Sequence, residues 1–102
     1  MKQLTESQIE ARIETMFDAI DTRLMAGEIS QEQYDFDAAC INAWERSARL
    51  TIREYKTWNA WVTGDHIKTT IVAGNAEDAR LLYAWRHGMA HDSRITVEGP
   101  NR

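Results

Sequence analysis

The chain contains two helix-start signals within its first third, and this repeat constrains the fold more than any other feature. Thr5 is followed by Gln8, and Ser30 by Gln33, at the spacing of a capping box, in which the hydroxyl accepts from a free backbone N–H. Gly27 lies between the two starts and can end the first helix, because glycine adopts the left-handed conformation without steric cost. A link this short makes the helices antiparallel neighbours, so the sequence predicts a helical hairpin.

Apolar residues at helical spacing follow both starts. The first stripe consists of Ile9, Ile13, Met16, Phe17, Ile20 and Leu24. The second consists of Tyr34, Ala38, Ile41, Ala48, Ile52 and Tyr55. No glycine or proline interrupts residues 29–63. We therefore expect a first helix over residues 5–26 and a second helix over residues 30–56.

The sequence period changes after the second stripe. Residues 58–62 alternate between two faces and predict a strand, although a second helix extended to Val62 and stopped at Gly64 is an alternative. A hairpin loop at residues 64–65, a strand over 66–73, a helix over 76–87 capped by Asn75, and a strand over 94–98 complete the expected order. If the strands at 66–73 and 94–98 pair in parallel, their crossover should be right-handed.

These elements predict one α+β domain over residues 1–102, in the order α-α-β-β-α-β. The N-terminal helical hairpin would pack on a ββαβ unit over residues 58–98. With 43% hydrophobic and 27% charged residues, the chain has the composition of a globular domain.

Cysteine content and hydropathy limit the environment that we expect. Cys40 is the single cysteine, which rules out an intrachain disulfide and fits a reducing compartment. No apolar run is long enough for a membrane span, and the N-terminus has no apolar signal-peptide region. We therefore expect a cytoplasmic protein.

The charges divide unevenly along the chain. Residues 1–45 carry ten acidic and three basic side chains, whereas residues 46–102 carry nine basic and six acidic ones. Arg46, Arg49, Arg53 and Lys56 are spaced by three, four and three residues, which would place them on one stripe of the second helix.

Two interpretations of this stripe remain open. It could bind an external anion, either nucleic-acid phosphates or an acidic protein surface. Alternatively, it could pair with Glu6, Glu10 and Glu14 of the antiparallel first helix, or with the same residues of a second chain in a homodimer.

Four tryptophans are many for a chain of this length. If residues 58–62 form a strand, Trp58 and Trp61 point to opposite faces of the sheet, so one of them can be exposed. Exposed tryptophans serve as anchors in protein interfaces and as stacking platforms for single-stranded nucleic acids, whereas buried ones fill cores.

The sequence offers no set of residues suited to catalysis or metal binding. His87 and His91 have zinc-ligand spacing, but Gly88 between them is expected to end the helix. The aspartates at positions 18, 21, 35 and 37 lie on faces that look solvated, whereas acid–base catalysis needs a pocket. Cys40 has no histidine or aspartate partner at catalytic spacing. We therefore expect no cofactor, no metal and no enzymatic activity.

One short segment has a family likeness. Leu24 to Tyr34 joins a leucine, a Gly-Glu-Ile-Ser turn and an acidic-aromatic run, and it resembles the core of the short helical-hairpin SHOCT modules. The resemblance implies a helical hairpin and carries over no catalytic residue.

These observations favour a non-enzymatic protein-binding module, and one expectation for such a module is a phage or mobile-element protein that binds and inhibits a host protein. The expected partner-binding residues are Asp18, Asp21, Glu28, Glu32 and Asp35, together with Trp58 or Trp61. The alternative is a nucleic-acid-binding regulator that uses the stripe from Arg46 to Lys56.

Overall fold

The computed structural model describes residues 4–54, 56–89 and 94–101. Helix α1 spans Glu6–Met25 and helix α2 spans Gln31–Ala48. Thr5 and Gln8 form the predicted capping box, and the Ser30 hydroxyl accepts from the Gln33 N–H. Gly27 adopts φ 72° at the end of α1, where the Glu28 N–H donates to the Arg23 carbonyl at 2.9 Å. The predicted helical hairpin is confirmed.

The predicted length of the second helix is wrong, because α2 ends at Ala48 instead of residue 56. The chain leaves the helix at Arg49 and forms a short 3-10 helix, η1, over Ile52–Glu54. The Ser47 hydroxyl donates to the Val72 carbonyl at 2.9 Å, which ties this end of α2 to the sheet. Absence of glycine and proline permits a long helix but does not enforce one, since tertiary contacts override propensity.

Three strands follow: β1 (Thr57–Val62), β2 (Thr69–Val72) and β3 (Ile95–Asn101). Their order in the sheet is β2-β1-β3, with both pairs antiparallel. The strand at residues 58–62 is therefore confirmed over the extended helix. The possible parallel pairing of residues 66–73 with 94–98 does not occur, because both strands flank β1.

The connection between β1 and β2 is longer than predicted. Residues 63–68 separate the strands, and the Asp65 N–H donates to the Val62 carbonyl at 2.8 Å. The expected two-residue loop at 64–65 is thus only the first turn of a six-residue connection. Helix α3 spans Ala76–Arg86 and is capped by Asn75, as predicted. The fold is α+β with the element order α-α-β-β-α-β.

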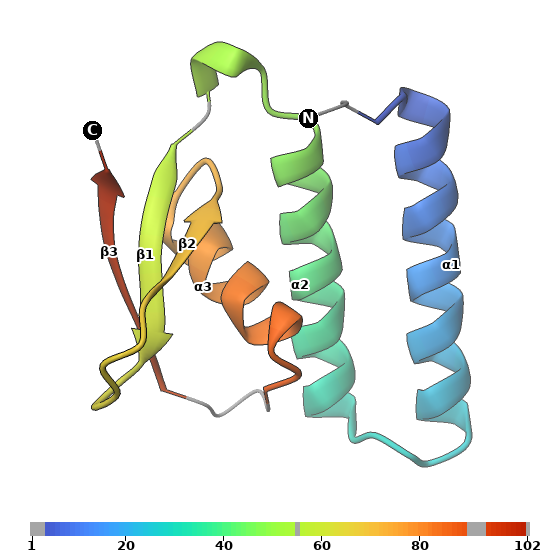
Figure 1. Cartoon of the computed structure of the whole chain (residues 1–102). Coiled ribbons are helices and arrows are strands. Elements are labelled where there is room, and N and C mark those ends of the chain that lie inside the picture. Colours follow the sequence, from blue (N-terminus) through green and yellow to red (C-terminus); the bar gives the residue numbers. More distant parts are fainter. Residues whose placement is uncertain (1–3, 55, 90–93, 102) are drawn as a thin grey trace.

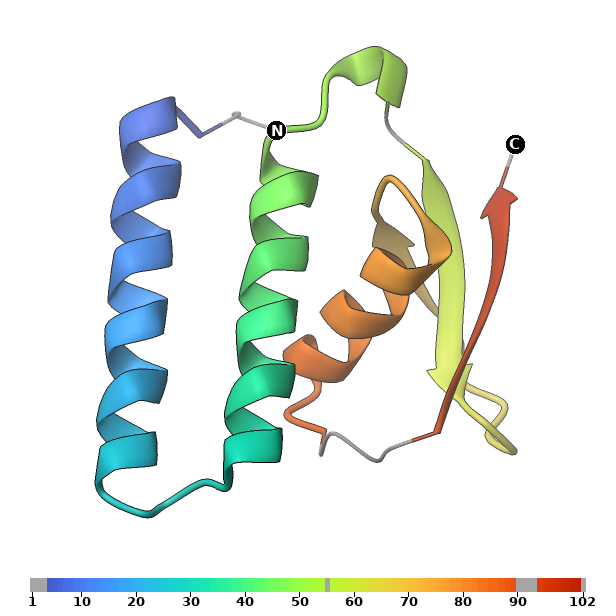
Figure 2. The same cartoon turned by 180° about the vertical axis from the view of Figure 1, so that it is seen from behind.

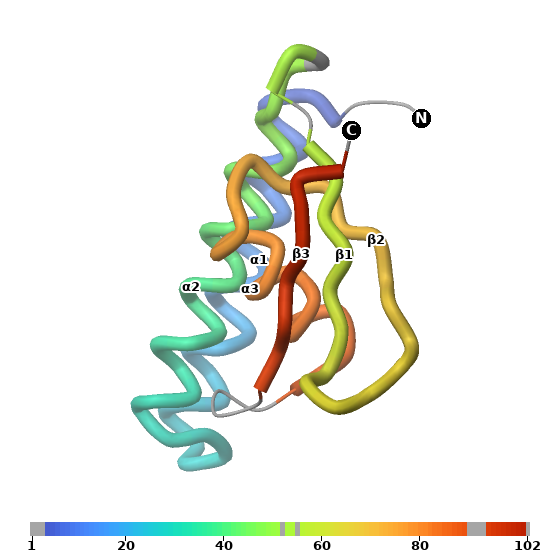
Figure 3. The backbone as a smooth tube through the Cα atoms, turned by 90° about the vertical axis from the view of Figure 1, so that its left-hand side faces the viewer, coloured from blue at the N-terminus to red at the C-terminus, as the bar shows by residue number. Residues whose placement is uncertain are grey.

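The elements are stacked side by side, as Figures 1 and 2 show. Helix α2 lies between α1 and α3, and α3 lies between α2 and the sheet. Figure 3 shows the three strands edge to edge, with the helices on one side of them. Among the described elements, α1 packs substantially against α2 alone. Much of the α1 surface therefore faces solvent.

Two apolar clusters hold these layers together. The cluster between the sheet and α3 contains Trp58, Ala60, Ile71, Ala73, Ala79 and Tyr83. The cluster between α2 and α3 contains Cys40, Ala43 and Leu81. The buried residues between α2 and α3 are mostly small, which lets these two helices pack closely. No described helix has the length and apolarity needed to cross a membrane.

Candidate binding groove

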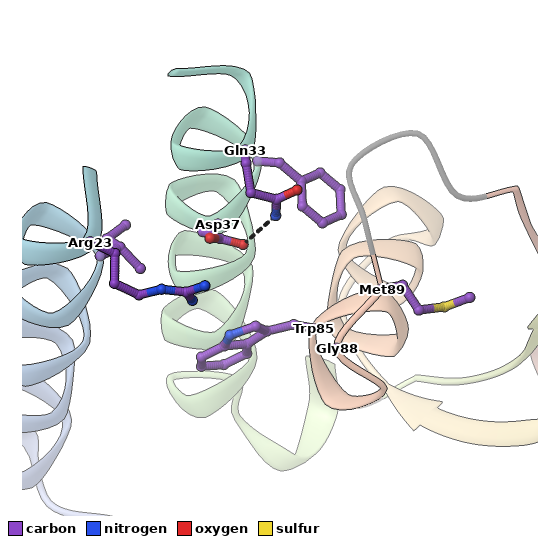
Figure 4. A pocket seen from close by; sticks show the side chains of 8 residues that line it. Arg23, Gln33, Asp37, Trp85, Gly88 and Met89 are labelled. Carbon is purple, nitrogen blue, oxygen red and sulfur yellow. Dashed lines mark hydrogen bonds between the residues drawn. The ribbon is translucent and has the colours of Figure 1, made fainter. Parts of the chain in front are cut away.

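A groove of about 480 Å³ opens where the three helices meet, at the end of the hairpin that carries the α1–α2 turn. We call it the binding groove. It is lined by Ile20, Arg23, Gln33, Phe36, Asp37, Trp85, Gly88 and Met89. Its size lies in the range of small-molecule and side-chain pockets, which is about 300–1,000 Å³. Its lining combines apolar residues with polar and charged ones, among them the Arg23, Gln33 and Asp37 side chains shown in Figure 4.

The end of α1 and the start of α2 each contribute residues to the groove. Ile20 and Arg23 come from the last turns of α1, one helical turn apart. Phe36 and Asp37 come from the first turns of α2. Since α1 and α2 are antiparallel, the end of one helix lies beside the start of the other.

The last turn of α3 and the residues that follow it form one side of the groove. Gly88 has φ 62°, a conformation that side-chain-bearing residues rarely adopt, and the Met89 N–H donates to the Ala84 carbonyl at 2.9 Å. This reversal places Met89 beside the last turn of α3, where Trp85 lies. Both residues are half-buried and line the groove, and the Met89 side chain extends away from Trp85 and packs against the cluster between the sheet and α3 (Figure 4).

Two charged side chains of opposite sign, Asp37 and Arg23, line the groove. Asp37 accepts a hydrogen bond from the Gln33 amide at 2.9 Å. Figure 4 shows the exposed Arg23 side chain reaching toward the groove from α1. Among the residues described, neither Asp37 nor Arg23 forms an ion pair within 4.0 Å.

Cys40 lies in the α2–α3 interface and is fully buried. Its thiol donates to the Leu81 carbonyl at 3.4 Å. Burial, and then the negative charge of Asp37, raise the pKa of the Cys40 thiol from 9.0 to about 12. The thiol is therefore protonated and inaccessible near neutral pH, which excludes it as a nucleophile.

The predicted partner-binding acids gather around the same end of the hairpin. Asp18, Asp21, Glu28, Glu32 and Asp35 are all exposed, and we call them the acidic end. Asp21 accepts from the Tyr34 hydroxyl at 2.5 Å, and Asp35 accepts from the Gln31 amide at 2.9 Å. The bond to Asp21 is the largest cause of the raised pKa of Tyr34. Met25, which is 88% exposed, adds an apolar side chain at the tip.

The basic residues do not form the predicted stripe, because α2 ends before three of them. Arg46 makes two hydrogen bonds, at 2.8 and 2.7 Å, to the buried carboxylate of Asp78 on α3. Arg49 pairs with Glu6 of α1 and with Glu45 of its own helix.

Arg53 lies in η1 and Lys56 precedes β1, and both are exposed. Of the ion pairs predicted between α1 and α2, the structure contains the one between Arg49 and Glu6. Arg46 pairs instead with Asp78 of α3. The single helical stripe of four cations, on which the nucleic-acid hypothesis rested, is absent.

The two tryptophans of β1 lie on opposite faces of the sheet, as expected. Trp58 is 8% exposed, and its indole N–H donates to the Ala73 carbonyl at 3.0 Å, so it belongs to the core. This burial removes Trp58 from the residues that can contact a partner. Trp61 faces away from the helices and is half-buried, with the Lys68 ammonium 4.5 Å from its ring centroid.

The structure offers no metal site in the part of the chain that it describes. No group of three or more His, Cys, Asp or Glu side chains could hold an ion there. His87 ends α3, with its ring centroid 4.4 Å from that of Tyr83. His91, the second histidine of the zinc-ligand spacing, lies outside the described residues.

The sequence did not predict the binding groove. In the sequence, Asp37 is only one of four candidate aspartates and Trp85 only one of four tryptophans, and nothing local connects either residue to Arg23, Phe36 or Met89. These residues come from three helices and from the turn after α3, and they share no local motif. No protein-family model, curated protein or solved structure matches the chain.

Proposed function

We propose that this protein is a non-enzymatic protein-binding module, and that the binding groove together with the acidic end forms its contact surface. The observation that carries this proposal is the binding groove itself. It is open at the surface, and its lining includes Trp85, Phe36 and Met89. Tryptophan, phenylalanine and methionine are among the residue types enriched in protein interfaces.

The position of the groove supports the same proposal. It lies on the side of the molecule where α1 is covered by α2 alone, so a partner can approach along both helices. Amphipathic helices commonly bind in apolar grooves between helices of this kind. The acidic end borders the groove and adds an electrostatic field that would accelerate association with a basic partner.

Affinity capture from the native host tests this proposal. The bait is the whole chain, compared with a variant that carries Asp18→Lys and Glu28→Lys at the acidic end. A matched variant carries Glu10→Lys and Glu98→Lys, which changes the net charge equally at exposed positions outside that end. We expect one stoichiometric partner with the wild-type and matched baits, and its loss with the acidic-end variant. A partner retained equally by all three baits would refute the contact surface.

A further inference from the structure

The charged side chains of the hairpin end, beside the binding groove, are mostly acidic. Residues 18–37, which form both sides of the hairpin end, contain six carboxylates and a single base, Arg23. The acidic end contributes five of these carboxylates, and Asp37 in the groove contributes the sixth. The hairpin side of the groove therefore carries net negative charge, whose field falls off over roughly 8–10 Å at physiological ionic strength.

Hydrogen bonds inside the hairpin leave this charge in place. Asp21, Asp35 and Asp37 accept from a hydroxyl or a side-chain amide, at 2.5, 2.9 and 2.9 Å. Neutral donors of this kind orient a carboxylate without cancelling its charge. None of these three aspartates forms an ion pair with a described residue.

The groove is partly open, and its lining is part apolar and part polar. Ile20, Phe36 and Met89 come from different parts of the chain and supply apolar lining, and the groove volume of about 480 Å³ is large enough for a leucine or phenylalanine side chain. Trp85 lies at the edge of this space, and its indole N–H donates to no described residue. Burial of an apolar side chain here would remove apolar surface from water on both partners, which is the main favourable term in association.

We propose that the binding groove holds a basic amphipathic segment of a partner protein, with an apolar side chain in the groove and a lysine or arginine at Asp37. This inference rests on the proposed protein-binding function and adds the chemistry of the partner. Charge complementarity with the acidic end selects a basic segment over an acidic or neutral one. The apolar contact places that segment in the groove and not elsewhere on the acidic surface.

Arg23 allows a prediction of whether loss of its charge strengthens or weakens peptide binding. It is the single cation of the hairpin end, so it repels an incoming lysine or arginine. Removal of its charge should therefore strengthen binding of a basic segment and weaken binding of an acidic one. A groove built for a carboxylate ligand would show the opposite response.

A defined peptide probe tests the inference without knowledge of the natural partner. The probe is a fluorescein-labelled helical peptide of leucine and lysine in amphipathic order, and the control peptide has every lysine replaced by glutamate. Fluorescence anisotropy measures Kd for the full chain. We expect binding of the lysine peptide that weakens with added salt, and no binding of the glutamate peptide. Absence of binding by the lysine peptide would overturn the inference.

Three exposed or half-exposed positions serve as variants, each with its fold verified by thermal unfolding. Asp37→Asn should weaken binding about threefold to tenfold, and Arg23→Gln should strengthen it by a similar factor, as expected for single charge contacts. Glu98→Gln removes an exposed charge on β3 that does not line the groove, and it should leave Kd unchanged. Equal effects of Asp37→Asn and Glu98→Gln, or weaker binding by Arg23→Gln, would overturn the inference.

The four indole N–H signals locate the bound peptide independently of substitutions. In a ¹H–¹⁵N correlation spectrum, the Trp85 signal should shift on titration with the unlabelled lysine peptide. The Trp58 signal should stay fixed, because its N–H is buried and bonded to the Ala73 carbonyl. A fixed Trp85 signal would place the peptide outside the groove.

The inference and the proposed function can fail separately. If the natural partner is lost with the acidic-end variant while Asp37→Asn leaves peptide binding unchanged, the protein-binding function stands and this inference falls. If no partner depends on the acidic end, the proposed function itself fails.

Discussion

The ion pair between Arg46 and Asp78 allows the sharpest test of how the helices are held together. The Asp78 side chain is 5% exposed, whereas the Arg46 side chain is 55% exposed, and two hydrogen bonds at 2.7 and 2.8 Å join them. Arg46→Ala would leave a buried carboxylate without its counter-ion. Loss of one partner from a fully buried pair costs about 3–5 kcal/mol. Because water can replace part of the half-exposed guanidinium, we expect a loss of about 2 kcal/mol.

That loss is large for a domain of this size, whose total stability is on the order of 5–15 kcal/mol. It corresponds to a decrease in Tm of roughly 10 °C. Arg49→Ala is the matched control, because Arg49 makes its ion pairs at the surface and its removal should shift Tm far less.

Urea unfolding of four proteins provides the assay: wild type, Arg46→Ala, Asp78→Ala and the double variant. We expect the double variant to lose less stability than the sum of the single variants, because each single change already breaks the pair. Additive losses, or equal losses for Arg46→Ala and Arg49→Ala, would refute the account of this contact.

Three further predictions concern single positions. Gly88→Ala should destabilise the fold by about 1 kcal/mol in urea unfolding, because residue 88 has φ 62°; an unchanged midpoint would contradict this strain argument. Trp58→Phe should cost about 1–2 kcal/mol, because the Ala73 carbonyl loses its buried donor; a neutral change would show that the indole bond contributes little. The free energy of unfolding should fall as pH rises from about 9 to about 12, since the folded Cys40 thiol keeps its proton while the unfolded one ionises. Cys40→Ala should remove this part of the pH dependence, and an identical pH profile for the variant would contradict the assignment.

Local signals predicted the parts of the fold that local interactions decide. Thr5, Ser30 and Asn75 cap the three helices as their sequence context indicated, because a cap depends on residues within one turn. The alternation of residues 58–62 predicted β1, since one face of that strand is buried against α3.

Long-range contacts decided the features that the sequence did not predict. The end of α2 depends on the contact between Ser47 and Val72, which lie far apart in the chain. The pairing of Arg46 with Asp78 could not be foreseen, because it requires α3 to pack against α2. The binding groove was missed for the same reason, since only the packing of three helices brings Arg23, Asp37 and Trp85 together.

The central claim is that a partner protein contacts the binding groove, and site-specific photo-crosslinking in the native host tests it most directly. A photoreactive phenylalanine analogue replaces Arg23 at the rim of the groove in one variant and Glu98 on the sheet in another. Both positions are exposed, so the analogue should be tolerated at either. We predict a single crosslinked protein from position 23 and none from position 98. The same adduct from position 98, or no adduct from position 23, would contradict the claim.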